Sequence, residues 1–259
     1  MQVIGCQLDI AWEDKSTSHD RARELLATTP IAPGALIVLP EMFSTGFSMH
    51  VSTIAESSDG PTHSFLSQLA RERAAYVMGG VVTRATDDRG RNDAVVYGPQ
   101  GELVARYSKL HPFSYAGETR HYEAGSEVVT FPWHEFRVAP FVCYDLRFPE
   151  AFRRAARMGA QLMIVIANWP HPREAHWLAL LRARAIENQA YVVGVNRAGS
   201  DPHVRYGGRS LILDPRGETV AEAGEAPQVI SANLELAPLE EYRQHFPALA
   251  DMRADLLGK

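Results

Sequence analysis

Short apolar segments alternate with amphipathic ones along the first part of the chain. QVIGCQL near the N-terminus and ALIVLP at residues 35–40 are typical of short buried strands. The segment SHDRARELLATT between them has the apolar spacing of a helix, for which Ser16, Thr17 or Ser18 is the expected N-cap. THSFLSQLARERAA repeats the helical pattern. The chain therefore opens with alternating strands and helices.

Strands dominate the next stretch. YVMGGVVTR is strand-like, and DAVVYGPQGELVARYS indicates two strands joined by a turn at Pro99–Gly101. A polar loop is expected from His111 to Gly125, and the apolar run FRVAPFV then leads to Cys143.

The second half of the chain returns to strands and helices. It predicts a helix near residues 149–159, a strand in QLMIVIAN, a helix over about 173–189 and a strand in AYVVGVNR. RSLILDPRGETVAEA indicates a hairpin with its turn at Pro215–Gly217, and PQVISANLEL gives a last strand. This order suits two sheets packed face to face with helices outside, although the pattern alone also allows a three-layer α/β fold.

Length and composition indicate one globular unit. The 259 residues are 46% hydrophobic and 22% charged, enough to bury a substantial core. Length alone would allow two domains, but no Pro-, Gly- or Ser-rich linker divides the chain. We therefore expect a single domain over residues 1–259.

Charge and cysteine content exclude several classes of protein. A net charge of −5 gives no reason to expect nucleic acid or an anionic membrane as a partner. No apolar run approaches the ~20 residues of a membrane helix, and the N-terminus lacks the pattern of a signal peptide. Two distant cysteines, Cys6 and Cys143, do not make a disulfide framework. We expect a cytoplasmic protein.

Cys143 is the first candidate for chemistry. It lies between an apolar run and the helix-like stretch PEAFRRAARMGA. Unpaired backbone N–H groups and the positive end of a helix dipole at such a junction would favour the thiolate. The alternative is a buried structural cysteine, which is the interpretation we give to Cys6 in the first strand.

Two charged residues occupy comparable positions. Glu41 follows ALIVLP, and Lys109 follows the β-prone segment ELVARYS. A charged group at a strand end costs desolvation free energy unless it is paired or used, so either residue alone would be an ordinary ion-pair partner. With Cys143 they supply a base, a cation and a nucleophile, spaced 68 and 34 residues apart.

The contexts of these residues carry a family resemblance. PEMF, SKLHPF and CYDLRFPE occur in this order, and ANWP, HW..LLRARAIENQAYVVGVNRAG and YGGRSLILDPRGE extend the match over nearly the whole chain. The sequence resembles the nitrilase superfamily of carbon–nitrogen hydrolases, with their Glu–Lys–Cys triad, and most of all the omega-amidase branch. This resemblance implies an α/β fold of four layers, the α-β-β-α sandwich of the nitrilase type.

The resemblance also implies roles for the residues. Cys143 would attack an amide carbon, releasing ammonia and leaving a thioester. Glu41 would shuttle the proton and then activate water, with a pKa raised toward neutrality by partial desolvation. Lys109 would remain protonated and stabilise the oxyanion together with the backbone N–H of Tyr144.

A second glutamate is expected beside the triad. Glu118 matches the family position, where it would orient Lys109 and bind the amide nitrogen of the substrate; Glu123 in the same loop is the rival. His111 lies two residues after Lys109 and suggests a Cys–His pair, but a structural hydrogen bond is the favoured interpretation.

Similarity to omega-amidases implies small carboxylated amides as substrates, namely 2-oxoglutaramate and 2-oxosuccinamate. A planar guanidinium suits bidentate capture of their carboxylate, and Arg147 and Arg173 are the two candidates. Each has a glutamate nearby, Glu150 or Glu174, that would make a structural salt bridge instead. Trp169 is the expected wall of the pocket.

Other site types find no support in the motifs. HExxH, CxxC, GxGxxG and GKS/GKT patterns are absent from the sequence, so we expect neither a metal nor a cofactor. An N-carbamoyl amino-acid amidohydrolase, a nitrilase and a catalytically silent binding protein of the same fold remain alternatives. The resemblance further suggests a homodimer formed through the helices near 149–159 and 173–189.

Overall fold

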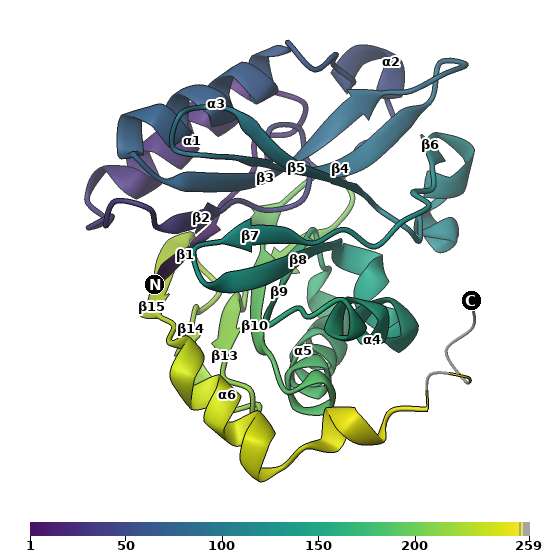
Figure 1. Ribbon diagram of the computed structural model, residues 1–259. Coiled ribbons are helices and arrows are strands. Elements are labelled where there is room, and N and C mark those ends of the chain that lie inside the picture. Colours follow the sequence, from purple (N-terminus) through teal and green to yellow (C-terminus); the bar gives the residue numbers. More distant parts are fainter. Residues whose placement is uncertain (254, 256–259) are drawn as a thin grey trace.

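Two sheets form the centre of the protein, as the computed structural model of residues 1–253 and 255 shows (Figure 1). The first has the order β15-β1-β2-β3-β4-β5, with β6 paired to β4. The second has the order β14-β13-β10-β9-β8-β7. The strands of the first sheet are β1 (Gln2–Gln7), β2 (Leu36–Val38), β3 (Tyr76–Arg84), β4 (Gly90–Tyr97), β5 (Leu103–Ser108), β6 (Tyr122–Glu123) and β15 (Gln228–Asn233). Those of the second are β7 (Phe131–Trp133), β8 (Phe136–Val142), β9 (Leu162–Ala167), β10 (Tyr191–Asn196), β13 (Leu211–Leu213) and β14 (Thr219–Glu222).

Helices cover the outer face of each sheet. The first sheet carries α1 (Lys15–Ala27) and α3 (Pro61–Arg73), and the second carries α4 (Pro149–Arg157) and α5 (Glu174–Asn188) (Figure 1). The remaining elements are α2 (Val51–Ile54), α6 (Leu236–His245), a hairpin of β11 (Ala198–Ser200) and β12 (Arg205–Gly207), and the 3-10 turns η1 (Ser114–Ala116), η2 (Glu118–Arg120), η3 (Cys143–Arg147), η4 (His171–Arg173) and η5 (Ala248–Asp251).

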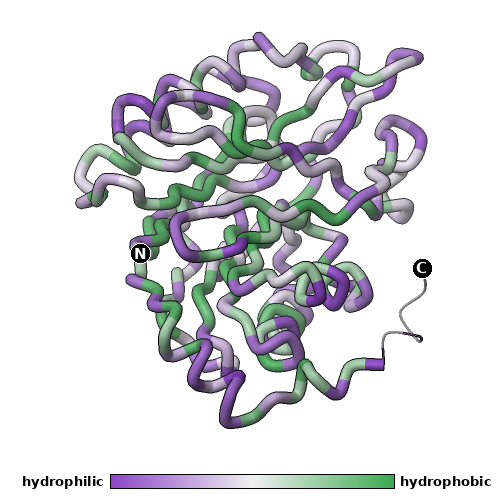
Figure 2. Tube along the Cα trace, in the orientation of Figure 1, coloured by the Kyte–Doolittle hydropathy of each residue, from purple (hydrophilic) through white to green (hydrophobic). Residues whose placement is uncertain are grey.

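The hydrophobic core has separate inner and outer layers. Val38 and Met78 of the first sheet share one buried cluster with Val138 and Phe141 of the second. Ile37 points the other way, into a cluster beneath α1 and α3. Alternate residues of the strands therefore face the partner sheet and the helices. Hydrophobic segments accordingly concentrate in the strands (Figure 2). The expected four-layer α-β-β-α sandwich is confirmed, and the three-layer alternative is wrong.

Most predicted elements are present, with three differences. Asp14, rather than Ser16, Thr17 or Ser18, caps α1, because its carboxylate precedes the first turn and accepts from the N–H of Thr17 at 3.0 Å. The expected loop from 111 to 125 contains η1, η2 and the short strand β6, and α6 was not predicted. Both predicted turns are confirmed: Gly98 N–H donates to Glu102 O, and Asp214 N–H to Glu218 O.

The helices expected to pair two subunits contribute much of their apolar surface to the protein's own core. Phe152, Trp177 and Leu181 are fully buried and pack in the inner cluster. They are therefore not available to a partner, and a dimer formed through these helices would have to use other side chains. Leu178 and Leu180 are half-buried, and Ile186 of α5 is 49% exposed.

Strand direction brings the candidate residues to one edge. β2 and β3 are parallel, and two antiparallel steps through β4 give β5 the same direction as β2. Glu41 and Lys109 therefore follow strands that end at the same edge of the first sheet. Cys143 and Asn168 follow the parallel strands β8 and β9 of the second sheet. Ligands commonly bind outside the carboxyl ends of parallel strands.

A close backbone approach fixes the segment that carries Glu41. Gly80 N–H donates to Pro40 O at 3.0 Å, and Phe43 N–H donates to Gly80 O at 3.3 Å. A Cβ at position 80 would lie 2.3 Å from the Met42 nitrogen and 2.5 Å from the Glu41 Cα. Glycine at this position therefore allows the segment to pack directly on β3.

Among the residues that the structure describes, no helix is both long and apolar enough to cross a membrane.

Candidate active site

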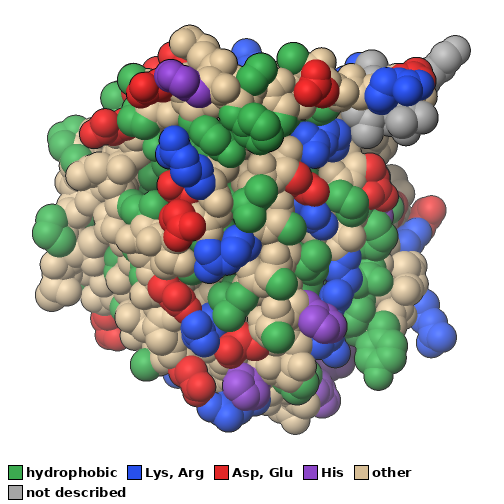
Figure 3. Space-filling view, turned by 90° about the horizontal axis from the view of Figure 1, so that it is seen from below, with side chains coloured by type: hydrophobic (Ala, Val, Ile, Leu, Met, Phe, Trp, Pro, Cys, Tyr) green, Lys and Arg blue, Asp and Glu red, His purple; other side chains and the backbone are tan. Residues whose placement is uncertain are grey.

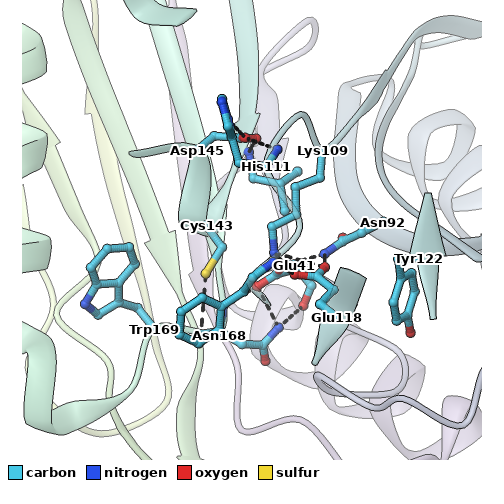
Figure 4. A network of polar contacts seen from close by, with 12 residues as sticks. Glu41, Asn92, Lys109, His111, Glu118, Tyr122, Cys143, Asp145, Asn168 and Trp169 are labelled. Atoms are coloured by element: carbon cyan, nitrogen blue, oxygen red, sulfur yellow. Dashed lines mark hydrogen bonds and ion pairs between the residues drawn. The ribbon is translucent and has the colours of Figure 1, made fainter. Parts of the chain in front are cut away.

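Lys109 is held between two buried carboxylates. Its Nζ donates to Glu41 Oε1 at 2.9 Å and to both oxygens of Glu118, at 3.1 and 2.8 Å. Figure 4 shows the three side chains converging on one another. Each of them is at most 1% exposed. Such a buried arrangement persists only when the charges are paired and hydrogen-bonded. The structure thus brings together three of the predicted residues, although they come from three separate segments.

Asn92, at the start of β4, completes this cluster. Its Nδ2 donates to Glu41 Oε1 at 2.7 Å and to Glu118 Oε1 at 3.0 Å. Its backbone carbonyl accepts from the N–H of Lys109 at 2.9 Å. One residue therefore contacts every member of the charged cluster.

The second sheet holds the other oxygen of Glu41. Asn168, directly after β9, donates its backbone N–H to Glu41 Oε2 at 2.8 Å. Its side-chain Nδ2 donates to the Glu41 carbonyl at 2.7 Å and to Oε2 at 3.3 Å. The carboxylate of Glu41 is thus hydrogen-bonded by groups from both sheets.

Cys143 projects into the same space from the end of β8. Its φ of 48° lies in the left-handed region, which is uncommon for a residue other than glycine. This backbone conformation starts the turn η3 directly after the strand. The thiol Sγ lies 4.0 Å from the carbonyl oxygen of Asn168 (Figure 4). Cys143 is partly exposed and lines a cavity.

Asp145 connects the cysteine turn with the segment after Lys109. Its carboxylate accepts from the N–H of Val142 at 3.1 Å and from the N–H of His111 at 2.9 Å. The His111 ring, 2.8 Å away, and the hydroxyl of Tyr107, also at 2.8 Å, complete its contacts. His111 also stacks on Phe148, with ring centroids 3.8 Å apart. The structural interpretation of His111 therefore fits its contacts better than a Cys–His pair.

The thiol of Cys143 is held in its neutral form. Burial and the negative charge of Glu41 raise its pKa well above the usual value, against the opposing effect of Lys109. The expected thiolate at a helix N-terminus is wrong for a physical reason. The residues after Cys143 form a short 3-10 turn, and the helix proper starts only at Pro149. The dipole of α4 therefore does not act at the sulfur.

Glu41 also differs from expectation. Burial acts to raise its pKa, but Lys109 and the amides of Asn92 and Asn168 hold the pKa below its usual value. The pKa near neutrality expected from desolvation is therefore wrong for the resting site. Burial likewise opposes the charge on Lys109, but Glu118 and Glu41 raise its pKa well above normal. The resting site combines a neutral thiol with ionised Glu41 and Lys109.

A cavity of about 180 Å³ opens in front of Cys143. Aromatic side chains make up much of its wall, and the basic groups that reach it are Lys109, Arg147 and Arg173. The aromatic residues of the lining are Phe47, Phe113, Tyr115, Tyr144, Trp169 and Tyr206. Such a cavity accommodates a small molecule with an anionic group.

Both candidate arginines line the cavity, but they are held differently. The Arg147 guanidinium lies 4.8 Å from the Trp169 ring centroid and 3.2 Å from Nδ1 of His176. Arg173 lies 5.6 Å from the ring of Phe113, and its carbonyl accepts from Trp169 Nε1 at 2.7 Å. Trp169 thus walls the cavity, as expected, and contacts both arginines.

Comparison with known proteins identifies the family. Residues 4–244 match the sequence profile of the carbon-nitrogen hydrolase family. The chain belongs to the carbon-nitrogen hydrolase family. It is therefore a hydrolase of carbon–nitrogen bonds other than peptide bonds, and the resemblance seen in the sequence is confirmed.

Relatives of this hydrolase match along most of their length. The omega-amidase YafV of Yersinia enterocolitica is 43% identical, over 97% of this chain and 96% of its own. The 2-oxoglutaramate amidase of Paenarthrobacter nicotinovorans is 38% identical, over 96% and 91% of the two chains. The crystal structure of XC1258 from Xanthomonas campestris, a CN-hydrolase superfamily protein with an arsenic adduct in its active site, matches with a TM-score of 0.91. It is 34% identical and covers 98% of this chain and 97% of its own.

The structure separates the two candidate glutamates of this hydrolase. Glu118 lies in the cluster with Lys109, whereas Glu123 accepts from Arg91 Nη2 at 2.8 Å and from the hydroxyl of Thr86 at 2.8 Å, outside the cluster. The choice of Glu118 therefore fits the geometry.

Sequence reasoning missed Asn92, Asn168 and Asp145. Asn168 was visible in the ANWP block and Asp145 in CYDLRFPE, each next to a residue already chosen. Asn92 carried no local signal, because only the pairing of β4 with β5 brings it beside Lys109. Among the described residues of this hydrolase, no group of three or more His, Cys, Asp or Glu side chains is placed to hold a metal ion.

Proposed function

We propose that this protein is an omega-amidase that hydrolyses 2-oxoglutaramate and 2-oxosuccinamate to the 2-oxo dicarboxylic acid and ammonia. The observation that carries the proposal is an arginine, Arg147, held in the same cavity as the Cys143 thiol. The similarity to an omega-amidase and a 2-oxoglutaramate amidase along nearly the whole chain supports it.

Glu41 and Cys143 perform the acylation. Ionised Glu41 accepts the thiol proton as Sγ attacks the amide carbon, so the thiolate forms only during attack. The proton then passes to the departing nitrogen, which leaves as ammonia, and a thioester remains on Cys143. In the second half of the reaction Glu41 takes a proton from water, which attacks the thioester carbon. The C–S bond then breaks, the carboxylic acid is released, and the proton passes from Glu41 to Sγ, which restores the thiol and the carboxylate.

Lys109 and Tyr144 stabilise the tetrahedral oxyanion. Lys109 is a permanent cation because the two glutamates raise its pKa. The N–H of Tyr144 belongs to the first turn of η3, where N–H groups have no carbonyl partner inside the helix. Both donors are fixed before the substrate arrives, which is the condition for effective electrostatic catalysis. Glu118 orients Lys109 and accepts a hydrogen bond from the substrate amide nitrogen.

Arg147 is the better of the two candidates for the substrate carboxylate. Stacking on Trp169 and the contact with His176 fix the plane of its guanidinium, as bidentate capture requires. Neither alternative salt bridge, Arg147–Glu150 or Arg173–Glu174, is formed among the described residues. Glu174 instead pairs with Arg209 at 3.1 Å and lies 3.3 Å from His171. Arg173 also lines the cavity. It is a second cation there, and its guanidinium has fewer contacts than that of Arg147.

The experiment compares Arg147→Lys with Arg173→Lys on 2-oxoglutaramate and on an uncharged amide of similar length. Loss of bidentate binding predicts a KM for the keto-amide raised about 10- to 100-fold in Arg147→Lys, with little change for the uncharged amide. Equal losses on both substrates would remove the carboxylate role. Release of carbon dioxide with ammonia from N-carbamoyl acids, or turnover of nitriles, would instead favour the alternative activities.

We infer further that the enzyme acts in the cytoplasm as a homodimer. The homodimer rests on family resemblance and on the apolar side chains that α5 leaves accessible, Leu178, Leu180 and Ile186.

A further inference from the structure

Two carboxylates and one ammonium share a volume from which water is excluded. Glu41, Glu118 and Lys109 leave this cluster with one negative charge in excess. Two carboxylates that share a buried site normally cannot both stay ionised, and one of them takes up a proton. A proton on Glu41 would occupy the position needed for the proton of the Cys143 thiol. Besides Lys109, the N–H of Asn168 donates to Glu41 and the N–H of Phe113 donates to Glu118, but each of these two donors reaches only one carboxylate. A donor that reaches both would also hold them together.

Asn92 is placed to do this. Its two amide hydrogens point at Oε1 of Glu41 and Oε1 of Glu118, at 2.7 and 3.0 Å. A single rigid amide thereby spans the two carboxylates. Hydrogen bonds donated to a carboxylate stabilise its ionised form. The side chain is 1% exposed, so water does not compete for these contacts.

The orientation of the amide is fixed by the charges around it. Turning the amide over would place its oxygen against two negatively charged oxygens. In the orientation present, Oδ1 of Asn92 is buried and has no hydrogen-bond partner within the described part of the chain. Leaving a buried acceptor unpaired costs free energy. The two contacts with the glutamates offset that cost.

We propose that Asn92 is a positioning residue that holds the carboxylates of Glu41 and Glu118 at a fixed separation around Lys109, so that Glu41 is oriented to accept the proton of the Cys143 thiol. The proposal rests on the proposed role of Glu41 as the proton acceptor. Asn92 itself does not contact the reacting atoms. The backbone carbonyl of Asn92 accepts a hydrogen bond from the N–H of Lys109, which fixes the position of Lys109 relative to Asn92.

The titratable groups around Glu41 come from several elements. The amide of Asn92 donates to Glu41 from β4. The charged or ionisable neighbours of Glu41 lie on other elements. They are Lys109 after β5, Glu118 of η2, Tyr122 of β6, Cys143 of η3 and Tyr206 of β12.

The test is the pH profile of kcat/KM for Asn92→Leu and Asn92→Asp. The leucine variant loses both donors, so the pKa of Glu41 rises and the acid limb moves to higher pH by about one unit. At neutral pH Glu41 stays ionised in the variant, but its carboxylate is no longer held in place, so kcat should still fall about tenfold. KM should change little, because Asn92 does not line the cavity. The profile is measured with whichever amide, carbamoyl acid or nitrile the wild type hydrolyses best. A wrong substrate assignment therefore leaves the test intact.

The aspartate variant gives the opposite signature and nearly preserves the shape of the side chain. While protonated, the new carboxyl can still donate to one glutamate; once ionised, it repels both. Its activity should therefore fall as the pH rises, and this holds even if the leucine variant does not fold.

Asn188→Leu is the control. Asn188 is also fully buried and donates to Arg184 O at 3.0 Å, away from the cavity. It should lower stability without moving the pH profile. A folded Asn92→Leu with the wild-type profile and kcat would overturn the proposal, as would an identical shift in Asn188→Leu.

Discussion

At the scale of single residues, the left-handed backbone of Cys143 and the charge state of Glu41 decide how the nucleophile is activated. The positive φ ends β8 abruptly and turns the sulfur into the cavity. The thiol stays neutral because it is largely removed from solvent and faces a carboxylate, so the resting site contains an ionised proton acceptor and a protonated nucleophile. Before a substrate binds, Cys143 is therefore in its less reactive thiol form.

Glu41→Gln tests this charge state. Burial is the largest cause that raises the thiol pKa, and Glu41 is the next. Removing the Glu41 carboxylate leaves burial and Glu118 to raise this pKa, whereas Lys109 continues to lower it. The pH midpoint for alkylation of Cys143 by iodoacetamide should therefore move to lower pH, while amide turnover is lost. Peptide mass mapping identifies the labelled cysteine, and Cys6 should stay unlabelled, since it is fully buried and burial raises its pKa to about 12. A midpoint that stays in place or moves upward would contradict the assigned charge state.

Lys109→Ala tests the oxyanion role. Loss of one fixed electrostatic donor typically lowers kcat about 10²- to 10³-fold. The two buried glutamates also lose their cation, which should destabilise the fold by about 3–5 kcal/mol. Turnover and urea unfolding are measured on the same preparation. A large loss of stability with nearly normal turnover of the folded fraction would reduce Lys109 to a structural ion pair.

At the scale of secondary-structure elements, the packing of the Glu41 segment on β3 positions the base. In Gly80→Ala the new methyl group would overlap the backbone of Glu41 and Met42, so the segment must move. Geometric displacement of a catalytic group by 1 Å can lower the rate about 100-fold. We expect a loss of kcat at least tenfold, with KM nearly unchanged, because position 80 does not line the cavity.

Gly224→Ala is the matched control. A Cβ at position 224 would meet its nearest atom, Gln228 Nε2, at 3.4 Å, which is an ordinary contact. Its kinetics should equal those of the wild type. Normal turnover in Gly80→Ala would show that the segment adapts without moving the carboxylate.

The sequence predicted best the elements whose type can be recognised from one continuous segment. Strand β9 and helix α5 were found nearly residue for residue, since β9 is an uninterrupted apolar run and α5 is a long stretch without Gly or Pro. The capping of α1 and the bridge made by Asn92 were not found. The N-cap of α1 had to be chosen among several neighbouring polar residues. The contacts of Asn92 depend on which strands pair. The three charged or nucleophilic residues could be chosen from their contexts, but their protonation states required the buried geometry.

At the scale of the whole molecule, the proposed dimer has a direct test. Phe152, Trp177 and Leu181 are used by the core, which leaves Leu178, Leu180 and Ile186 of α5 for an interface. On the face seen from below, hydrophobic side chains lie between charged ones (Figure 3). Light scattering at micromolar concentration should give twice the 28.7 kDa of one chain. A 28.7 kDa particle would contradict the dimer, and Ile186→Lys should weaken it if α5 takes part.

The division of the site between the two sheets makes turnover a reporter of folding. Glu41 and Lys109 follow strands of one sheet, whereas Cys143 and the Asn168 amide that fixes Glu41 follow strands of the other. Neither sheet alone contains a nucleophile together with its base. During refolding, secondary structure can return while each sheet forms, but hydrolysis can return only when the two inner faces have docked. The delay between the circular dichroism signal and the first release of ammonia would therefore measure the time that docking takes.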